Sequence, residues 1–190
     1  MIRTNNELLG YTTELNKLEI QKFIAEQSFV PKQKIIQQGK KVFYVYIIKS
    51  GIAKCYLTEE NGKDFVQEFF GAGEIFGEIE TINNNTSFCY IEAITEMKVY
   101  KIPQKHFHKL LENNMKFNQL VLKSLAAKIK YKALRHSFNQ SHTIESNILR
   151  LENHLPEFSK IISKEDIANY LGITLRSLNR TLNILNEKLT

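Results

Sequence analysis

The middle of the chain, from Lys34 to Lys101, is a series of short apolar runs separated by turn residues. The runs are KIIQQG, VFYVYIIKSG, AKCYLT, DFVQEFF, GEIFGE, FCYIEAI and KVYKI. Strands of this length, repeated about every ten residues, predict a small antiparallel barrel or jelly roll with an interior able to hold one small ligand. Asn61-Gly62 lies between two of these runs. Because both residues tolerate positive φ, the pair predicts a hairpin with a type I′ turn.

Helical patterns lie on both sides of this region. The first covers about Asn5 to Gln27 and ends before Pro31, and the longest runs from Met115 to Phe138. The long helix carries two apolar stripes, one of Phe117, Leu120, Ser124, Ala127, Tyr131, Leu134 and Phe138, the other of Val121, Leu122, Leu125 and Ile129. Two apolar faces require two partners. We expect the barrel to cover one face and the same helix of a second subunit the other. The alternative is that the domains of one chain cover both.

We expect the dimer to form through one part of the first stripe, namely Phe117, Leu120, Ser124, Ala127, Tyr131 and Leu134.

The last segment, ISKEDIANYLGITLRSLNRTLNILNEK, predicts two short helices with a glycine turn between them. Ser163 is suited to cap the first helix, Gly172 to end it, and Thr174 to cap the second. This is the pattern of a helix-turn-helix, whose second helix enters the major groove of DNA. The residues that then face the bases or phosphates are Thr174, Leu175, Arg176, Ser177, Asn179 and Arg180.

The charge distribution agrees with a polyanionic partner for the C-terminal part. Residues 1–114 hold 14 Lys and Arg against 14 Asp and Glu, whereas residues 115–190 hold 12 against 6. The whole net charge of +6 therefore lies after residue 114. We expect a cytoplasmic protein without a membrane segment, because no apolar run is long enough and the N-terminus is amphipathic and contains acidic residues.

The chain resembles bacterial transcription regulators of the CRP/FNR family over nearly its whole length. The resemblance rests on IIQQGKKVFYVYIIKSGIAKCYL, FVQEFFGAGEIFGE, the long helix and IANYLGITLRSLNRTL. It implies an α+β fold with a cyclic-nucleotide-binding-like effector domain at residues 1–112, a dimerisation helix at 113–140 and a helix-turn-helix domain at 141–190. A dimer of this architecture is expected to bind an inverted repeat in double-stranded DNA. The resemblance also implies contact with RNA polymerase, and both activation and repression stay open.

The recognition helix departs from the family pattern. The family has an arginine where this chain has Leu175 and a glutamate where it has Arg176, while Arg180 is retained. The usual half-site of the family is therefore not expected here. The sequence ends where the family continues into a β-wing, so we expect part or all of the wing to be absent, either natively or through shortening.

The segment GEIFGEIETINNNTSFCYIEAIT corresponds to the family's cyclic-nucleotide site. Gly77 and Glu78 match the turn and the glutamate that takes the ribose hydroxyl, but the phosphate-binding arginine falls at Ser87 or Thr86, and Phe88 replaces a small residue. A phosphate without its cation loses a charge-assisted contact. We therefore expect control by something other than cyclic AMP. The expected effector pocket comprises Gly77, Glu78, Ser87, Phe88 and Ser124.

Other sensing chemistries find little support. Cys55 and Cys89 are too few for a zinc or iron–sulfur site and are interpreted as buried thiols, although a thiol switch stays open. His106 and His108 do not share a helix face, so no haem, metal or other cofactor is expected, and a cupin-like enzyme is disfavoured. An unknown small-molecule effector, a protein partner and no effector at all stay open. Two alternative functions also stay open, a regulator that responds to a cyclic nucleotide and a signalling subunit whose roll binds a small ligand.

Overall fold

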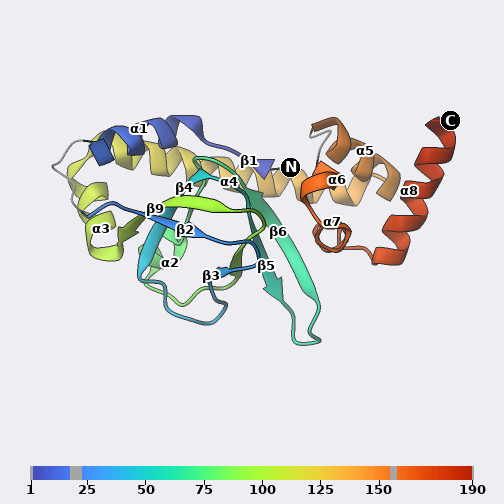
Figure 1. The fold of residues 1–190 in the computed structure, drawn as a ribbon, viewed down its shortest axis with the longest axis horizontal. Coiled ribbons are helices and arrows are strands. Elements are labelled where there is room, and N and C mark those ends of the chain that lie inside the picture. Colours follow the sequence, from blue (N-terminus) through green and yellow to red (C-terminus); the bar gives the residue numbers. More distant parts are fainter. Residues whose placement is uncertain (1, 18–22, 155–157, 190) are drawn as a thin grey trace.

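The computed structural model describes residues 2–17, 23–154 and 158–189. They form a β-roll, a long helix along it and a group of C-terminal helices (Figure 1). The strands are β1 Ile2–Arg3, β2 Ala25–Phe29, β3 Lys34–Ile36, β4 Tyr44–Ser50, β5 Ala53–Thr58, β6 Asp64–Phe70, β7 Ile75–Phe76, β8 Tyr90–Ala93 and β9 Met97–Pro103. The helices are α1 Asn6–Lys17, α2 Glu78–Asn83, α3 Gln104–Asn113, α4 Met115–Ser141, α5 Ile144–His154, α6 Phe158–Ile161, α7 Lys164–Leu171 and α8 Leu175–Leu189. The predicted α+β class is confirmed.

Two sheets build the roll. One has the strand order β1-β6-β5-β8-β3 and the other β2-β9-β4-β7. Alternating apolar residues of both sheets meet in a buried core that includes Ile48, Phe70, Ile91 and Val99. The expected antiparallel pairing holds, except that β1 runs parallel to β6. This pairing brings Arg3 beside the buried Glu68 and Glu74, at 3.3 Å from each.

Two local predictions were wrong. The first helix was expected to reach Gln27, but Ala25–Phe29 is strand β2, because its backbone pairs with β9 from Ala25↔Lys101 to Phe29↔Met97. The part of that pattern at residues 18–22 lies outside the described residues. The hairpin at Asn61-Gly62 is correct, but its turn is not type I′, since Gly62 has a φ of 78° and Asn61 has no positive φ. The Asn61 side chain instead accepts a hydrogen bond from the backbone N–H of Lys63.

The long helix α4 passes along the roll and continues to the C-terminal helices, with α1 beside it (Figure 1). Its expected dimer face is wrong in part. Phe117, Leu120 and Ser124 are at most 3% exposed in the single chain. Phe117 and Leu120 pack in a core that also contains residues of α1, α3 and the roll, so they are not available to a second subunit. Ala127 and Leu134 are exposed and Tyr131 is half-buried.

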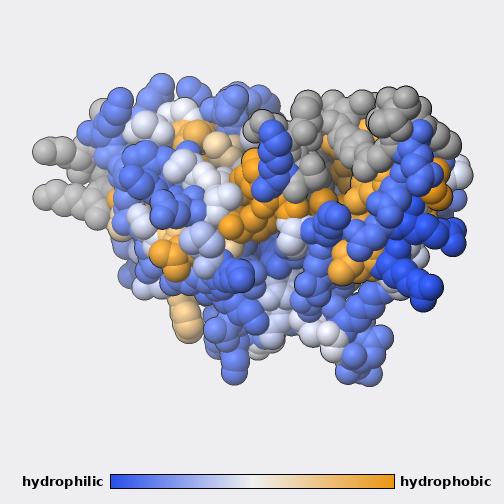
Figure 2. Space-filling view, turned by 45° about the vertical axis from the view of Figure 1, so that its right-hand side comes forward, coloured by the Kyte–Doolittle hydropathy of each residue, from blue (hydrophilic) through white to orange (hydrophobic). Residues whose placement is uncertain are grey.

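The free apolar face of α4 is instead made of residues seven apart. Met115, Leu122 and Ile129 are 77%, 59% and 71% exposed. Ala126 and Ala133 lie between and beyond them and are also exposed. In the space-filling view, hydrophobic surface shows between the roll and the C-terminal helices on a mostly hydrophilic face (Figure 2). One chain thus covers one apolar stripe of α4 and leaves another open.

The C-terminal helices dock on the outer side of the five-stranded sheet. Helix α7 contacts β6, and the rings of Tyr170 and Phe69 lie 5.2 Å apart. Lys54 of β5 donates to Asp166 of α7 at 2.7 Å. Arg135 near the end of α4 donates to the carbonyl oxygens of Gln67 and Tyr170. A shared apolar cluster and polar contacts therefore join the two parts.

Candidate nucleic-acid interface and ligand pocket

The helix-turn-helix predicted from the sequence is present, with its caps. Ser163 accepts from the backbone N–H of Asp166 at the start of α7, and Gly172 ends that helix with a φ of 70°. Thr174 accepts from the backbone N–H of Ser177 at 3.1 Å and begins α8. These short polar side chains satisfy N–H groups that a helix start leaves unpaired, which fixes where each helix begins.

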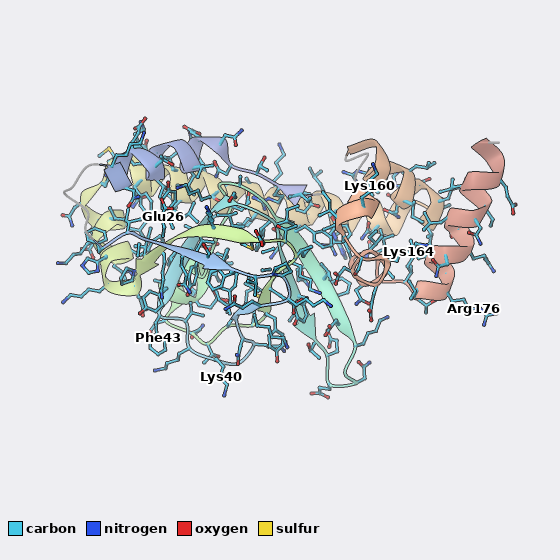
Figure 3. All side chains as sticks on the ribbon, viewed as in Figure 1. Glu26, Lys40, Phe43, Lys160, Lys164 and Arg176 are labelled. Atoms are coloured by element: carbon cyan, nitrogen blue, oxygen red, sulfur yellow. The ribbon has the colours of Figure 1, made fainter. Side chains whose placement is uncertain are left out.

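Helix α8 has a buried inner face and an exposed outer face. Leu178 and Leu185 are at most 6% exposed and hold the helix on the C-terminal core. Arg176 and Arg180, one turn apart, are both exposed, as are Leu175 and Thr174. Ser177 and Asn179 are half-buried. The structure therefore brings the two arginines together at the N-terminal half of an exposed helix face, where Figure 3 shows Arg176 pointing away from the domain.

In the roll, Gly77 and Glu78 form the turn that resembles a phosphate cradle. Gly77 has a φ of 84°, and a Cβ atom there would lie 2.7 Å from the carbonyl oxygen of Tyr44. Glycine is thus required both by conformation and by space. Helix α2 starts directly after it with Glu78, which is 1% exposed. The Glu78 carboxylate consequently points into the interior of the protein.

The partner of Glu78 is Lys128, a residue of α4 that sequence reasoning missed. Its Nζ lies 2.6 Å from Glu78 Oε1 and also donates to the carbonyl oxygen of Ile75. Burial alone would lower the pKa of Lys128, but the Glu78 carboxylate, with Glu74 and Glu68 further away, raises it above the ordinary value. The side chain is an ammonium held among carboxylates, in the place where the family resemblance puts a ligand.

The remaining predicted pocket residues are only partly together. Gly77, Glu78 and Phe88 line a cavity of about 30 Å³, together with Lys128 and Lys132. A cavity of this size admits water-sized molecules. Ser87, at the expected arginine position, donates to Glu80 Oε1 at 2.9 Å, so it belongs to a protein hydrogen bond and not to the lining. Ser124 is buried on α4 outside the lining.

The chain is similar to known proteins in the roll and over most of its length. The family described as "Cyclic nucleotide-binding domain" matches residues 26–114. The chain is 27% identical to "Regulatory protein YeiL" of Escherichia coli O157:H7 over 79% of this chain and 69% of that protein. It is 24% identical to the "Fumarate and nitrate reduction regulatory protein" of Vibrio cholerae over 88% of this chain and 73% of that protein. The chain is therefore similar in sequence to regulators of the CRP/FNR family.

Solved structures of CRP/FNR proteins share the fold. The c-di-GMP-responsive regulator CLP of Xanthomonas campestris superposes with a TM-score of 0.79 over 93% of this chain and 92% of its own, at 14% identity. FixK2 of Bradyrhizobium japonicum gives 0.72 over 87% and 85%, at 20% identity. The curated relatives are named as regulatory proteins and not as enzymes. Within its described residues, none of the helices combines the length and apolar character needed to cross a bilayer.

Proposed function

We propose that this CRP/FNR regulator binds double-stranded DNA as a homodimer, with α8 in the major groove and no cyclic nucleotide in the roll. The observation that carries the proposal is the pair Arg176 and Arg180, both exposed on one face of α8. An arginine donates bidentately to O6 and N7 of guanine, and successive turns of one helix reach neighbouring base pairs. Arg176 replaces an acidic residue of the family pattern, so the operator differs from the usual one.

Phosphate contacts have their own candidates. Lys160 and Lys164 are exposed on the domain that presents Arg176 (Figure 3). The nearby Asp166 is only half-exposed and is paired with Lys54 of the roll, so its charge is compensated. The basic excess of residues 115–190, 12 Lys and Arg against 6 Asp and Glu, points the same way.

The exposed stripe of α4 supports the dimer. Met115, Leu122 and Ile129 are spaced by one heptad and are exposed in the single chain. Such a stripe buries its apolar area when two copies of the helix pack side by side. A two-fold axis along α4 places two copies of α8 symmetrically, which calls for an inverted repeat with half-sites about one helical turn apart.

Lys128 supports independence from cyclic nucleotides. Its ammonium already pairs with Glu78, the residue that the family resemblance assigns to the ribose hydroxyl. A cyclic nucleotide would have to displace the Lys128 side chain from the pocket. This would break its ion pair with Glu78 and leave a buried charge without compensation, which is costly. The proposal also includes three regions, an effector domain at 1–112, a dimerisation helix at 113–140 and a DNA-binding domain at 141–190. It further includes a cytoplasmic location and contact with RNA polymerase.

The test is selection of DNA from a random duplex pool, followed by affinity measurements at several salt concentrations. We expect an inverted repeat to be enriched. We expect the double variant Arg176→Ala/Arg180→Ala to lose about tenfold or more in affinity, since each guanine contact is worth about 1–3 kcal/mol. Lys63→Ala/Lys98→Ala removes the same charge from exposed positions of the roll and serves as the matched control. Equal affinity of the two variants would overturn the assignment of α8 and favour a signalling subunit that contacts protein.

A further inference from the structure

The two cysteines of the chain face each other inside the roll. The Sγ atoms of Cys55 and Cys89 lie 3.1 Å apart, although the residues are 34 positions apart in sequence. They are 4% and 3% exposed. Cys55 belongs to β5, and Cys89 directly precedes β8, the neighbouring strand. The pairing of β5 with β8 therefore holds the two thiols in contact.

Both thiols line the cavity that also contains Glu78 and Lys128. This cavity of about 30 Å³ is large enough to admit a small polar molecule. The Ser87 hydroxyl oxygen lies 2.9 Å from the Cys89 carbonyl oxygen, so its one hydrogen is shared between this acceptor and Glu80. Both sulfur atoms therefore border the same cavity, and a small reagent that enters it can reach either of them.

We propose that Cys55 and Cys89 are an oxidation site of this regulator, at which a small hydroperoxide converts the two thiols into an intramolecular disulfide. One thiolate attacks a peroxide oxygen, the O–O bond breaks, and a sulfenic acid and the reduced hydroxyl part of the peroxide result. The second thiol then attacks the sulfenic sulfur, the S–S bond forms and water leaves. Together the two sulfurs lose two electrons and two protons, and with hydrogen peroxide the products are one disulfide and two molecules of water.

Burial slows the first step. A hydrogen bond with Cys89 and burial raise the pKa of Cys55 well above its ordinary value, so little thiolate exists at neutral pH. The positive Lys132 nearby acts in the opposite direction. We therefore expect oxidation by peroxide to speed up as pH rises, and reduction by a dithiol to reverse it.

The position of the pair connects this chemistry to the C-terminal helices. Along β5, Cys55 faces the roll interior, while its neighbours Lys54 and Tyr56 face the other way. Lys54 donates to Asp166 of α7, and Tyr56 stacks on Tyr90 of β8 with ring centres 5.1 Å apart. The contact of Lys54 with Asp166 holds α7 against the sheet, whereas the stacked tyrosines lie within the sheet beside it.

Formation of the bond must bring the two sulfurs closer together. A disulfide has sulfurs about 2.05 Å apart, so the Cys55 and Cys89 sulfurs must approach by about 1 Å. Because the interior is close-packed, we expect part of this movement to be transmitted to β5 and β8 and to the side chains on their outer faces. We infer that the disulfide loosens the docking of α7.

The experiment uses the full chain, reduced and then treated with hydrogen peroxide over a range of pH. After quenching, the protein is unfolded and alkylated, and its intact mass gives the number of thiols left. We expect a monomeric species with no free thiol, lighter by two hydrogen atoms, which dithiothreitol returns to two free thiols. Sulfinic acids, disulfides only between chains, or two thiols that stay free throughout would each overturn the proposal.

A second measurement, hydrogen exchange of the α7 amides, tests whether the disulfide loosens the docking of α7. We expect exchange at least fivefold faster in the oxidised protein, the lower end of the typical coupling range of about 5–150-fold. The variant Cys55→Ala/Cys89→Ala, treated with the same peroxide, controls for oxidation of Met97 and Met115. Unchanged α7 exchange in a fully formed disulfide would overturn the link to the C-terminal helices. Neither readout involves DNA, so a failure of the DNA-binding function would be seen separately.

Discussion

Nζ of Lys128 lies 2.6 Å from Oε1 of Glu78, although the two residues are 50 positions apart and belong to α4 and α2. Their side chains are 7% and 1% exposed. The pair joins the helix that carries the free apolar stripe to the turn that the family uses for its ligand. Interior charges of this kind are tolerated when each satisfies the other, and removal of one leaves the second without compensation.

The first prediction concerns this pair. Lys128→Met and Glu78→Gln should each lower the free energy of unfolding by about 3–5 kcal/mol, because each leaves a buried charge behind. The double variant should lose clearly less than the sum of the two, since no unpaired charge of the pair remains. Urea unfolding of the four proteins measures the coupling. Additive losses would show that the two side chains do not stabilise each other.

The second prediction concerns nucleotides. Cyclic AMP and cyclic GMP should not raise the melting temperature of the protein, because a ligand stabilises only the folded state that it binds. The cavity beside Glu78, about 30 Å³, has no space for a nucleotide unless Lys128 leaves it. A thermal shift assay up to millimolar nucleotide checks this. A shift that grows with concentration would mean that Lys128 is readily displaced.

The third prediction concerns the dimer. Leu122→Glu together with Ile129→Glu should convert a dimer to a monomer, since two carboxylates per helix would face each other across the two-fold axis. Val30→Glu, at a position 62% exposed on the roll, is the control and should remain dimeric. Sedimentation velocity distinguishes the species. A dimer that survives both glutamates would place the contact on another surface.

The fourth prediction concerns pH. Burial raises the pKa of Glu74 above the ordinary value of 4.5, and this outweighs the opposite influence of Arg3 and Lys128. The folded state then holds this proton more tightly than the unfolded state does. The stability that Glu74 contributes should therefore be complete below pH 4.5 and decrease as pH rises through its pKa in the folded protein.

Comparison with Glu74→Gln isolates this effect, because glutamine does not titrate. The difference in free energy of unfolding, wild type minus variant, should decrease between about pH 4 and 7. Urea unfolding at several pH values within that range provides the measurement. An increase with pH would show instead that the ion pair of Glu74 with Arg3, at 3.3 Å, lowers its pKa.

Local chemistry explains which parts of the fold were predictable. The helix-turn-helix was predicted with its caps because Ser163, Gly172 and Thr174 act on backbone groups within a few residues. The strands from β3 to β9 were predicted from alternation and turns. Strand β2 was taken for helix because Phe23 and Ile24 continue an apolar helical spacing, and only pairing with β9 decides its conformation.

The pocket was harder to predict because its decisive contacts are distant in sequence. The absence of an arginine at Ser87 was visible, but the cation that pairs with Glu78 comes from α4. A signal for it existed, since Lys128 continues the spacing of the buried residues Phe117, Val121 and Ser124. A lysine in register with an apolar stripe requires a buried anion. Two members of this row, Phe117 and Ser124, were assigned to the dimer because spacing alone does not say which face the roll covers.

The Lys128 ammonium beside Glu78 also differs from a bound ligand in how it depends on the composition of the cell. A side chain on the same polymer has a fixed effective concentration at its site, set by the geometry of α4 and not by metabolism. It is neither diluted, exported nor broken down apart from the protein. Each folded chain therefore carries its own cation beside Glu78, whatever small molecules surround it.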